Sequence, residues 1–574
     1  MGFILLASYP FTAQLLLSGL AFFLVAFGQP AWFPWNGLIA AIIGYALFFR
    51  VLVDIDSKKY RFWLGFSWFF CVQLVQMSWF LTHPFLYIYG VYFFITTWLG
   101  AQFGFIALLI RSDVFRSPSL GRAVWQSLLI ASVWTVFEWS RLFLLSGLSW
   151  NPVGLALTSS IYTLQMASLW GVFGLSFWVM FVNGLALYAW LNFKKKFTPI
   201  IIWGVAAAIP YLYGMAQLEF HKGNTPSKYL TAMLVQTAFP PEEMEDRPKG
   251  KGIVRSVIDE WRQIIEIMKS HRDEKVDLIV LPEFVVPFGT FSFIYPLDEV
   301  IAVFQEALPL QDLKFLPSPD YPFVAMQNTF HGPALFANNA YWVQALSNYF
   351  QSDIIVGLED AEEVSEGVIE YYSSAQFTHP QNTHSPETLF AKRYAKQVLV
   401  PMGEYIPFSF CKKLAKRYGI CGSFTHGKEA VIMNCRGVPF SPSICYEETF
   451  GHLMTEGRQK GADLFVNLTS DVWYPNSKLP RQHLDHARLR TVENGVPLIR
   501  SCNTGITVAL DSFGRSIAIL GGECPEKVEW EPNALVVDVP IYSYQTFYSQ
   551  FGDKIVIFIS LFLIGMFSII RYLV

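Results

Sequence analysis

Three residues in the middle of the chain have the side-chain chemistry that acyl transfer needs. Glu283 ends a Leu-Pro-Glu segment, Lys396 ends a Tyr-Ala-Lys segment, and Cys445 lies within Ile-Cys-Tyr-Glu. Because a thiol with a pKa of about 8.5 is only slightly ionised at neutral pH, a nucleophilic Cys445 needs a nearby base or a positive field. Glu283 could take the thiol proton, and Lys396 could stabilise the oxyanion of a tetrahedral intermediate.

Each of these residues also has a purely structural explanation. Most glutamates that follow a strand, as Glu283 does, are exposed loop residues. A single cysteine such as Cys445 is more often a buried core residue, and Lys396 ends an Ala-Lys-Arg-Tyr-Ala-Lys run that is typical of a solvated basic face. Only their joint occurrence, on elements that bring them together, favours a catalytic site.

The pattern around these residues predicts an α/β domain. An apolar strand at 230–238, a helix with apolar residues at helical spacing over 253–268, and a second strand at 276–281 form a strand-helix-strand unit. Glu283 directly follows the second strand, and Cys445 follows another apolar strand. Since α/β sheets commonly place ligand-binding groups beyond strand ends, both residues are well placed for chemistry.

The composition predicts that this domain is attached to a membrane. Of the 574 residues, 53% are hydrophobic and only 15% are charged, and aromatic residues alone make up 17%. A chain this apolar is typical of an integral membrane protein. The net charge of −3 gives no basic surplus, so we expect no nucleic-acid partner.

Eight apolar stretches predict membrane spans. Each of the first seven holds about 18 to 27 residues, enough for a helix to cross about 30 Å of hydrocarbon. The eighth is shorter, but Lys554 and Arg571 at its ends could reach the two interfaces. The first stretch has no basic start and no small-residue cleavage site, so we expect a retained helix rather than a signal peptide. The stretches are 4–27, 32–49, 62–82, 85–110, 124–145, 165–191, 198–217 and 555–570.

Every second loop between these stretches is basic, which predicts their orientation. Lys and Arg near span ends are retained in the cytoplasm, so both termini are expected inside and the α/β domain on the outer face. The predicted organisation is a seven-span bundle at 1–217, an extramembrane domain at 218–550 with an irregular insertion at about 291–352, and a last span at 551–574. The basic residues are Lys58, Lys59 and Arg61, then Arg111, Arg116 and Arg122, then Lys194, Lys195 and Lys196.

The order of the three reactive residues resembles the Glu-Lys-Cys triad of the nitrilase superfamily. Over nearly the whole chain the resemblance is to the apolipoprotein N-acyltransferase family, the membrane-bound branch of that superfamily. A soluble nitrilase would share the triad but not the spans. Further motifs similar to the family are Leu399–Pro407, Asn467-x-x-Ser470-Asp471-x-Trp473, Gln482–Arg490, Arg500–Thr507, and in the membrane part Glu138-x-x-Arg141 and Ser146–Trp150.

The resemblance implies a fold and a set of site residues. The fold is an α-helical transmembrane bundle of about eight spans joined to a nitrilase-like αββα sandwich. The catalytic residues are Glu283, Lys396 and Cys445, with Glu404 and Glu447 as supporting carboxylates. For these two carboxylates, an ordinary surface ion pair is the alternative explanation.

Three aromatic residues are candidates for binding the substrates. Trp150, Tyr446 and Trp473 would line the entry of the lipid chains. Aromatic residues also form interfacial belts and protein cores without touching any substrate, and that alternative stays open for each of the three.

The implied reaction passes an acyl chain from a phospholipid to Cys445 as a thioester, and then to the α-amino group of the lipidated N-terminal cysteine of an apolipoprotein. The expected partners are therefore a phospholipid donor, a diacylglyceryl apolipoprotein acceptor and membrane lipid. We expect no cofactor and no metal, because His and Cys spacing of the zinc type is absent. The resemblance also implies the bacterial inner membrane, with the catalytic domain in the periplasm. We expect a monomer.

Two features depart from the family pattern. Between Glu283 and Lys396 lie 112 residues, more than the resemblance leads us to expect, and the loop Gln236–Pro241 lacks the family's Gly-Asn and Trp residues. On an oxidising outer face Cys411 and Cys421 could form a disulfide, and the sequence leaves their connectivity open.

Two other functions are compatible with parts of the sequence. A membrane-tethered nitrilase-type amidase that hydrolyses small amides would share the triad, lose its acyl-enzyme to water and act without lipid. A non-catalytic membrane scaffold would keep the fold and have a dispensable triad.

Overall fold

The computed structural model of the protein describes residues 11–194, 197–240, 251–308, 313–381, 390, 392–417 and 423–573. The chain forms two compact units. The helical unit comprises Met1–Asn224, Asn476–Asn494 and Gln545–Val574, and the α/β unit comprises Thr225–Pro475 and Gly495–Tyr544.

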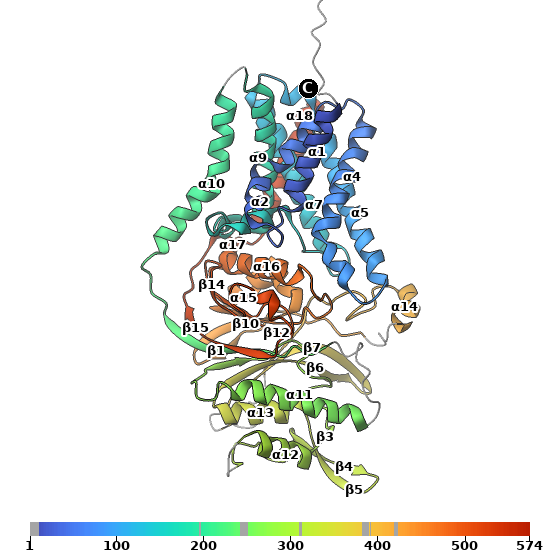
Figure 1. Cartoon of the computed structure of the whole chain (residues 1–574), viewed down its shortest axis with the longest axis vertical. Coiled ribbons are helices and arrows are strands. Elements are labelled where there is room, and N and C mark those ends of the chain that lie inside the picture. Colours follow the sequence, from blue (N-terminus) through green and yellow to red (C-terminus); the bar gives the residue numbers. More distant parts are fainter. Residues whose placement is uncertain are drawn as a thin grey trace, which may run out of the picture. The chain divides into compact units, whose positions relative to one another are not determined.

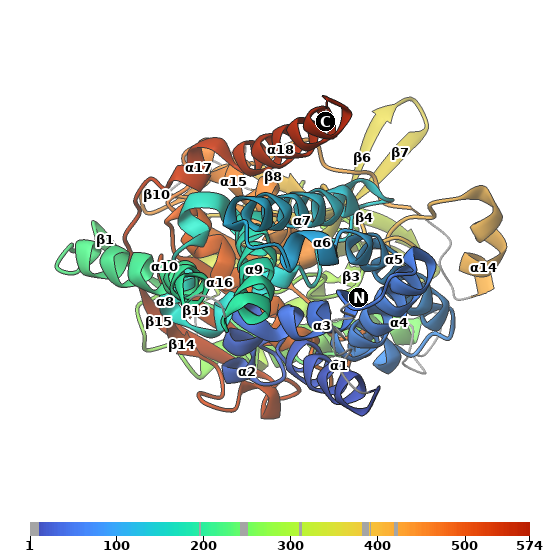
Figure 2. The same cartoon turned by 90° about the horizontal axis from the view of Figure 1, so that it is seen from above.

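Long apolar helices make up most of the helical unit (Figure 1). Helices α4 and α5 lie side by side, and α18 lies along α7 (Figure 2). The helices are α1 (Phe11–Ala26), α2 (Pro34–Ile39), η1 (Ala40–Gly44), α3 (Tyr45–Leu52), α4 (Lys58–Gln76), η2 (Ser78–Thr82), α5 (Tyr87–Leu108), α6 (Ser112–Phe115), α7 (Leu120–Ser140), η3 (Arg141–Phe143), η4 (Val153–Ser159), α8 (Ile161–Leu164), α9 (Ala167–Asn192), α10 (Thr198–His221), α16 (Leu479–Asn494), α17 (Phe547–Phe551) and α18 (Lys554–Leu573).

Several of these helices can cross a membrane. Within the described part of the chain, five are long and apolar enough: Pro34–Leu52, Tyr87–Leu108, Leu120–Phe143, Ala167–Asn192 and Thr198–His221. The apolar helices Phe11–Ala26 and Lys554–Ile569 are shorter. The predicted stretch 62–82 overlaps α4, which starts with two lysines. The helices therefore support a membrane protein, whereas the count of eight spans stays a prediction.

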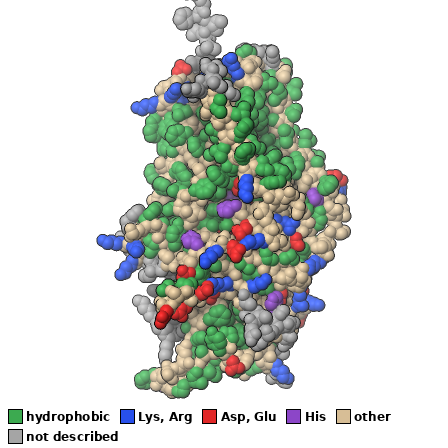
Figure 3. All heavy atoms as spheres, turned by 180° about the vertical axis from the view of Figure 1, so that it is seen from behind, with side chains coloured by type: hydrophobic (Ala, Val, Ile, Leu, Met, Phe, Trp, Pro, Cys, Tyr) green, Lys and Arg blue, Asp and Glu red, His purple; other side chains and the backbone are tan. Residues whose placement is uncertain are grey.

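The surface of the helical unit is apolar, as contact with lipid requires. Hydrophobic side chains cover much of its face in Figure 3. On a soluble protein, an apolar patch of this kind would have to be covered by a partner. Large exposed hydrophobic residues on its long helices include Leu15, Leu16, Phe93, Phe94, Phe105, Val205, Leu212, Phe558 and Phe562.

One polar segment packs within the helical unit. Helix α16 lies in the range 218–550 that we assigned to the extramembrane domain, yet it belongs to the helical unit, and nearly all of its side chains are buried. Two of its polar side chains bind backbone carbonyls of the helical unit: Gln482 Nε2 donates to the carbonyl of Gln76 at 2.8 Å, and Arg488 donates to that of Thr158 at 2.9 Å. The chain thus leaves the α/β unit after Pro475 and returns to it at Gly495.

Two six-stranded sheets form the α/β unit, with strand orders β15-β1-β2-β6-β7-β8 and β14-β13-β12-β11-β10-β9. A third, three-stranded sheet has the order β3-β5-β4. The strands are β1 (Lys228–Gln236), β2 (Leu278–Val280), β3 (Tyr295–Pro296), β4 (Val324–Thr329), β5 (Gly332–Ala337), β6 (Asp353–Ser365), β7 (Val368–Thr378), β8 (Lys392–Ala395), β9 (Met433–Cys435), β10 (Val438–Ile444), β11 (Leu464–Thr469), β12 (Leu498–Cys502), β13 (Val508–Leu510), β14 (Ser516–Ile519) and β15 (Asn533–Ile541).

The core of this unit lies between the two large sheets. Leu234 and Val280 of the first sheet and Phe440 and Val466 of the second belong to one buried apolar cluster. On the outer face of the first sheet, a second cluster joins it to α11 (Lys251–Lys269), α12 (Leu297–Ala307) and α13 (Asn339–Phe350). Figure 1 shows α11 and α13 along this face. Helix α15 (Gly451–Gln459) contacts β10 of the second sheet. These layers form the αββα sandwich that the resemblance implied.

The predicted strand-helix-strand unit is confirmed. Strand β1 is followed by α11 and then by β2, which pairs with β1 in parallel, and Ala232 lies opposite Leu278. Residues whose spacing predicted the helix are buried on α11: Val257, Trp261, Ile264, Ile265 and Met268.

The segment 291–352 is more regular than we expected. Outside 309–312, which is not described, it contains α12, the hairpin of β4 and β5, and α13. Helix α13 begins at an N-cap, where the side chain of Asn338 accepts a hydrogen bond from the backbone N–H of Tyr341 at 3.0 Å. The interpretation as irregular was wrong because α13 is buried on nearly all sides, so it lacks the polar face by which a helix is recognised in a sequence.

Candidate active site

Glu283 lies just beyond the end of β2, in a loop held against β6. The backbone N–H of Gly357 donates to the carbonyl of Pro282 at 3.2 Å, and the carbonyl of Gly357 accepts from Val285 at 3.0 Å. A Cβ atom at Gly357 would lie 2.6 Å from the Cα of Glu283. Glycine at this position therefore lets the loop approach the strand and places the Glu283 carboxyl in a buried position.

Lys396 directly follows β8 and is fixed on both sides of its backbone. Its N–H donates to the carbonyl of Ser373 at 2.8 Å, and its carbonyl accepts from Gly427 at 2.8 Å. A Cβ atom at Gly427 would lie 1.9 Å from the carbonyl oxygen of Ala395, so only glycine fits there. The Lys396 side chain is 1% exposed, which places an ammonium group in the protein interior.

Cys445 occupies the turn between β10 and the 3-10 helix η9 (Cys445–Thr449). Its φ of 54° lies in the left-handed region, which is strained for a residue with a Cβ atom and is seen most often at functional sites. Asn467 on the neighbouring strand β11 stabilises the turn, because its Nδ2 donates to the Cys445 carbonyl at 3.1 Å and to Ser443 Oγ at 3.0 Å. Cys445 remains partly exposed.

The structure brings these three residues into one cluster. Lys396 Nζ donates to Glu283 Oε1 at 2.8 Å and to Glu404 Oε1 at 2.7 Å. The Cys445 thiol lies close enough to Glu283 and Lys396 to influence the pKa of both groups. A carboxylate, an ammonium group and a thiol from the ends of β2, β8 and β10 therefore meet in one buried site.

Burial controls the ionisation of this cluster. It raises the pKa of Glu283, with Lys396 opposing the change and Glu404 reinforcing it. Burial alone would lower the pKa of Lys396, but Glu283 and Glu404 outweigh it and hold this pKa well above its usual value. Burial and the Glu283 carboxylate raise the pKa of the Cys445 thiol well above its usual value, against Lys396. The resting site thus holds a neutral thiol beside a permanent cation, and Glu283 is the group able to accept the thiol proton.

Glu404 positions Lys396. Its Oε1 accepts from Lys396, and its Oε2 accepts from the backbone N–H of Val400 at 2.8 Å. The backbone of Glu404 closes the same turn, since its N–H donates to the carbonyl of Val400 at 2.8 Å. The carboxylate expected to support the site is therefore a direct partner of the cation rather than half of an ordinary surface ion pair.

Glu447 connects the turn that carries Cys445 to the segment that follows Lys396. Its Oε1 accepts from the backbone N–H groups of Gln397 at 2.6 Å and Val398 at 3.1 Å. Its Oε2 accepts from Tyr394 Oη at 2.9 Å and from the backbone N–H of Ile444 at 2.8 Å. Burial raises the pKa of Glu447 to about 7, although its charged and hydrogen-bonding partners oppose the shift. Four hydrogen bonds thus make this carboxyl the connection between the two segments.

The predicted substrate-binding aromatic residues lie in different surroundings. Tyr446 is nearly buried, its ring centroid is 5.7 Å from Lys396 Nζ, and its hydroxyl donates to the carbonyl of Leu399 at 3.0 Å. Trp473 is partly exposed in the loop after β11. Trp150 belongs to the helical unit, where its ring contacts His483 and His486 of α16 with centroids 5.4 and 5.5 Å away. The structure thus brings Tyr446 to the lysine and thiol cluster.

The sequence did not single out every residue that builds the site. Gly357 and Gly427 permit the close approaches described above, but an isolated glycine in a sequence does not reveal what approaches it. Tyr394 and Asn467 were noted only as parts of motifs, and their roles as hydrogen-bond donors to Glu447 and to the Cys445 turn come from the structure.

The proposed disulfide between Cys411 and Cys421 lies outside the described residues, because Cys421 does. In the described ranges, no group of three or more His, Cys, Asp or Glu side chains could hold a metal ion.

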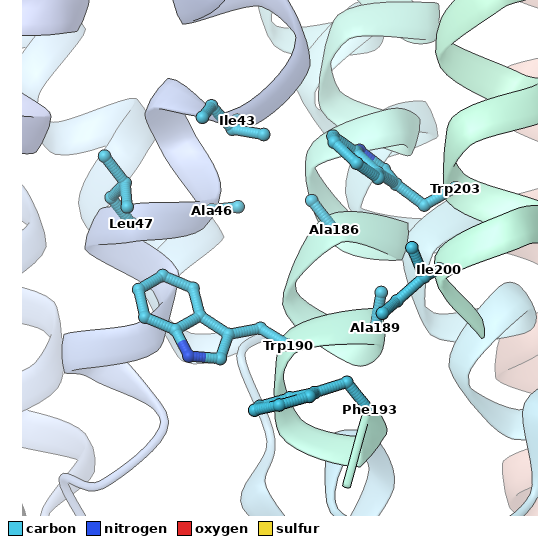
Figure 4. A pocket seen from close by; sticks show the side chains of 9 residues that line it. All are labelled: Ile43, Ala46, Leu47, Ala186, Ala189, Trp190, Phe193, Ile200 and Trp203. Carbon is cyan, nitrogen blue, oxygen red and sulfur yellow. The ribbon is translucent and has the colours of Figure 1, made fainter. Parts of the chain in front are cut away.

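The helical unit also contains an apolar crevice of about 260 Å³ between α3, α9 and α10 (Figure 4). It offers no nucleophile, acid or base, so it is not a second catalytic site. Its lining consists of Ile43, Ala46, Leu47, Ala186, Ala189, Trp190, Phe193, Ile200 and Trp203.

Two family models match different parts of the chain. Residues 21–185 match the family model of the apolipoprotein N-acyltransferase N-terminal domain, and residues 254–521 match that of the carbon-nitrogen hydrolases. The solved structure of Nit3 from Saccharomyces cerevisiae, a member of branch 10 of the nitrilase superfamily, covers 57% of this chain and 95% of its own, with 15% identity and a TM-score of 0.34.

Whole-length relatives are more similar. The apolipoprotein N-acyltransferase of Chlamydia pneumoniae is 31% identical over 553 residues, which is 94% of each chain. Those of Chlamydia muridarum and Chlamydia caviae are 32% and 33% identical, and each alignment covers at least 94% of this chain and 95% of the relative. With identity above 30% along almost the entire length and both family models matched, this chain belongs to the apolipoprotein N-acyltransferase family.

Proposed function

We propose that this protein transfers an acyl chain from a membrane phospholipid to the α-amino group of the lipidated N-terminal cysteine of apolipoproteins, through a thioester on Cys445. The observation that carries this proposal is the buried cluster in which Lys396 donates to both Glu283 and Glu404 and the Cys445 thiol lies close enough to influence the pKa of Glu283. Membership of the family supports the choice of substrates.

In the first half-reaction, Cys445 takes the acyl chain. Its sulfur attacks the ester carbonyl carbon of the phospholipid while Glu283 takes the thiol proton. Lys396 is already a cation before the reaction begins, so it stabilises the oxyanion without rearrangement. When the intermediate collapses, the ester C–O bond breaks, the lysophospholipid oxygen takes the proton from Glu283, and a thioester remains on Cys445.

In the second half-reaction, the amine of the apolipoprotein takes the chain. Its nitrogen attacks the thioester carbon, Glu283 accepts a proton from this nitrogen, and the C–S bond breaks to release the Cys445 sulfur, which recovers the proton. The product is an amide, which is more stable than the thioester or the original ester. The sequence of steps is ping-pong and leaves the enzyme unchanged.

The membrane location follows from the same chemistry. Both substrates are lipids with reacting groups near the headgroups, so the enzyme has to work at a membrane surface. We propose eight spans, the bacterial inner membrane, a periplasmic α/β unit within 218–550 and cytoplasmic termini, as the basic loops indicate. Trp150, Tyr446 and Trp473 line the lipid entry in this proposal, the protein acts as a monomer, and it needs no cofactor.

A chase experiment tests the transfer. Full-length protein in detergent is acylated from a phospholipid with a labelled chain and then divided between buffer and a diacylglyceryl peptide. The proposal predicts rapid loss of label to the peptide as an amide and slow loss in buffer. Release of free fatty acid at the same rate in both samples would instead indicate an amidase-type hydrolase. Cys524→Ala, at an exposed cysteine, is the control for Cys445→Ala.

A further inference from the structure

The candidate active site is divided between the two large sheets of the α/β unit. Glu283 and Lys396 follow β2 and β8 of the first sheet, whereas Cys445 follows β10 of the second. The apolar core between the sheets holds them together, but apolar contact has no preferred direction and does not fix one sheet edge against the other. A fixed distance between the base and the thiol therefore calls for directional bonds between the sheets.

Asn503 makes such bonds just beyond β12, the strand of the second sheet that contacts β1 of the first. Its Oδ1 accepts from the hydroxyl of Thr237 and from the backbone N–H of Phe239, both at 2.7 Å. Its Nδ2 donates to the carbonyl of Phe239 at 2.9 Å, and its own carbonyl accepts from the N–H of Ala238 at 2.8 Å. Four hydrogen bonds thus join Asn503 to the three residues that follow β1.

Asn503 also binds the strand next to the one that carries Cys445. Its backbone N–H donates to the carbonyl of Thr469 at 2.9 Å, and its Nδ2 donates to Ser470 Oγ at 3.2 Å. Thr469 and Cys445 each directly follow the last residue pair of the parallel strands β11 and β10. The contact with Thr469 therefore lies at the level of the nucleophile.

The residues that Asn503 holds after β1 lie at the level of the base. Strands β1 and β2 are parallel, and their last pair joins Leu234 to Val280. Thr237 and Glu283 each lie three residues beyond that pair. One side chain thus connects the end of the strand beside the base to the end of the strand beside the nucleophile.

Two further hydrogen bonds cross between the sheets next to Asn503. Ser501 Oγ donates to the carbonyl of Val235 at 2.6 Å, and Thr507 Oγ1 donates to Gln236 Oε1 at 2.9 Å. The three polar side chains in these bonds are buried. Because a buried polar group that loses its partner is costly, these bonds favour a single placement of β1 against β12.

We propose that Asn503 is a positioning residue that clamps the two sheets at the catalytic edge and so sets the distance between Glu283 and Cys445. Glu447 joins the sheets on the side of β8 and β10, and Asn503 joins them on the side of β1 and β12. The proposal rests on one part of the proposed function, the acylation of Cys445. It gives a role to the Arg500–Thr507 motif, which the reaction scheme had not used.

The rate of the first half-reaction tests this role. Full-length protein in detergent micelles is mixed with a phospholipid that has a labelled chain, and the label on Cys445 is followed over time at several phospholipid fractions. Asn503→Ala should lower the maximal acylation rate about 100-fold, the order of effect of a displacement of about 1 Å. The phospholipid fraction that gives half the maximal rate should stay unchanged, because the clamp does not bind the substrate.

Thr237→Val removes one bond of the clamp and keeps a side chain of similar size. It should lower the maximal rate by a smaller factor than Asn503→Ala. In the double variant it should have little further effect, because the bond that it removes is already lost. Losses that multiply would mean that the two residues act separately, which would contradict the clamp. If Asn503→Ala does not fold, Thr237→Val decides alone, and a native rate would overturn the proposal.

Asn348 on α13 provides a matched control. Both asparagines are 8% exposed, and the side chain of Asn348 also makes four hydrogen bonds. Helix α13, however, packs on the outer face of the first sheet, away from the core between the sheets. Asn348→Ala should therefore lower the melting temperature and keep the native acylation rate.

A native maximal rate in Asn503→Ala protein that still melts cooperatively would overturn the clamp, and so would an equal loss of rate in Asn348→Ala. Failure of the proposed function would look different. The acyl chain would then leave Cys445 for water in the native protein, and the acylation rates of the variants would still report on the clamp. A native protein that takes no label on Cys445 would overturn both.

Discussion

The Nζ atom of Lys396 lies 2.8 Å from Oε1 of Glu283, and both side chains are buried. In the mechanism that we propose, this contact joins the cation that stabilises the oxyanion to the base that generates the nucleophile. Because Lys396 also binds Glu404, it is held in place whether Glu283 carries a proton or not. The proposed base could therefore exchange protons in both half-reactions while Glu404 holds the cation in place.

Replacing the cation should destabilise the protein as well as inactivate it. Lys396→Met leaves Glu283 and Glu404 facing each other without a partner, which costs about 3–5 kcal/mol for a broken buried ion pair. We expect a lower melting temperature of the α/β unit and no acyl-enzyme. Lys392→Met is the control, because Lys392 is exposed and donates only to the carbonyl of Ile432 among the bonds described. Equal melting temperatures in the two variants would contradict the paired arrangement.

A single methyl group at Gly357 should disable the base without removing any reactive group. Gly357→Ala places a Cβ atom 2.6 Å from the Cα of Glu283, so the loop must move away from β6. Acyl-enzyme formation should fall about 100-fold, since a displacement of about 1 Å at a catalytic group has that order of effect. Gly121→Ala, where no atom lies within 4 Å of the added carbon, should keep native activity. A fully active Gly357→Ala protein would show that the position of Glu283 does not matter.

The pH dependence of acylation should respond to Glu404 in a defined direction. The Glu404 carboxylate raises the pKa of Glu283, so Glu404→Gln should lower that pKa. Glu283 must be deprotonated to act as the base, and the acidic limb of the single-turnover pH profile should therefore move to lower pH by about one unit. Glu306→Gln, at an exposed glutamate of the same unit, should not move it. A shift to higher pH would mean that Glu404 acts in some other way.

The raised pKa of Glu447 makes a prediction about stability. With a folded-state pKa of about 7, Glu447 retains its proton in the native state at pH values where an unfolded carboxyl has lost it. The native state therefore binds more protons between about pH 4.5 and 7, and this group makes the protein less stable as the pH rises through that window. Melting temperatures measured across the window should fall more steeply for the native protein than for Glu447→Gln. Parallel curves would mean that the pKa of Glu447 is not raised.

The convergence of Glu283, Lys396 and Cys445 could be predicted because their chemistry and order are visible in the sequence. Glu283 and Cys445 follow apolar strands, and the structure places both at strand ends beside Lys396. The role of Gly357 could not be predicted, because a glycine's close neighbour comes from a distant part of the chain. Helix α16 was assigned to the α/β domain because it continues the alternation of strands and helices in 218–550, but Gln482 and Arg488 of this helix donate to backbone carbonyls of the helical unit. Hydrogen bonds between residues far apart in the chain leave no periodic pattern of polar and apolar residues in the sequence.

The central claim, that Cys445 carries the acyl chain, is tested most directly by finding where the chain is attached. Full-length protein is incubated with a phospholipid that has odd-numbered chains, digested, and analysed by mass spectrometry before and after treatment with hydroxylamine, which cleaves thioesters. The account predicts one acylated peptide, containing Cys445, that loses the chain on treatment and is absent from Glu283→Gln. An acyl chain on any other residue, or full transfer activity in Cys445→Ala, would contradict it.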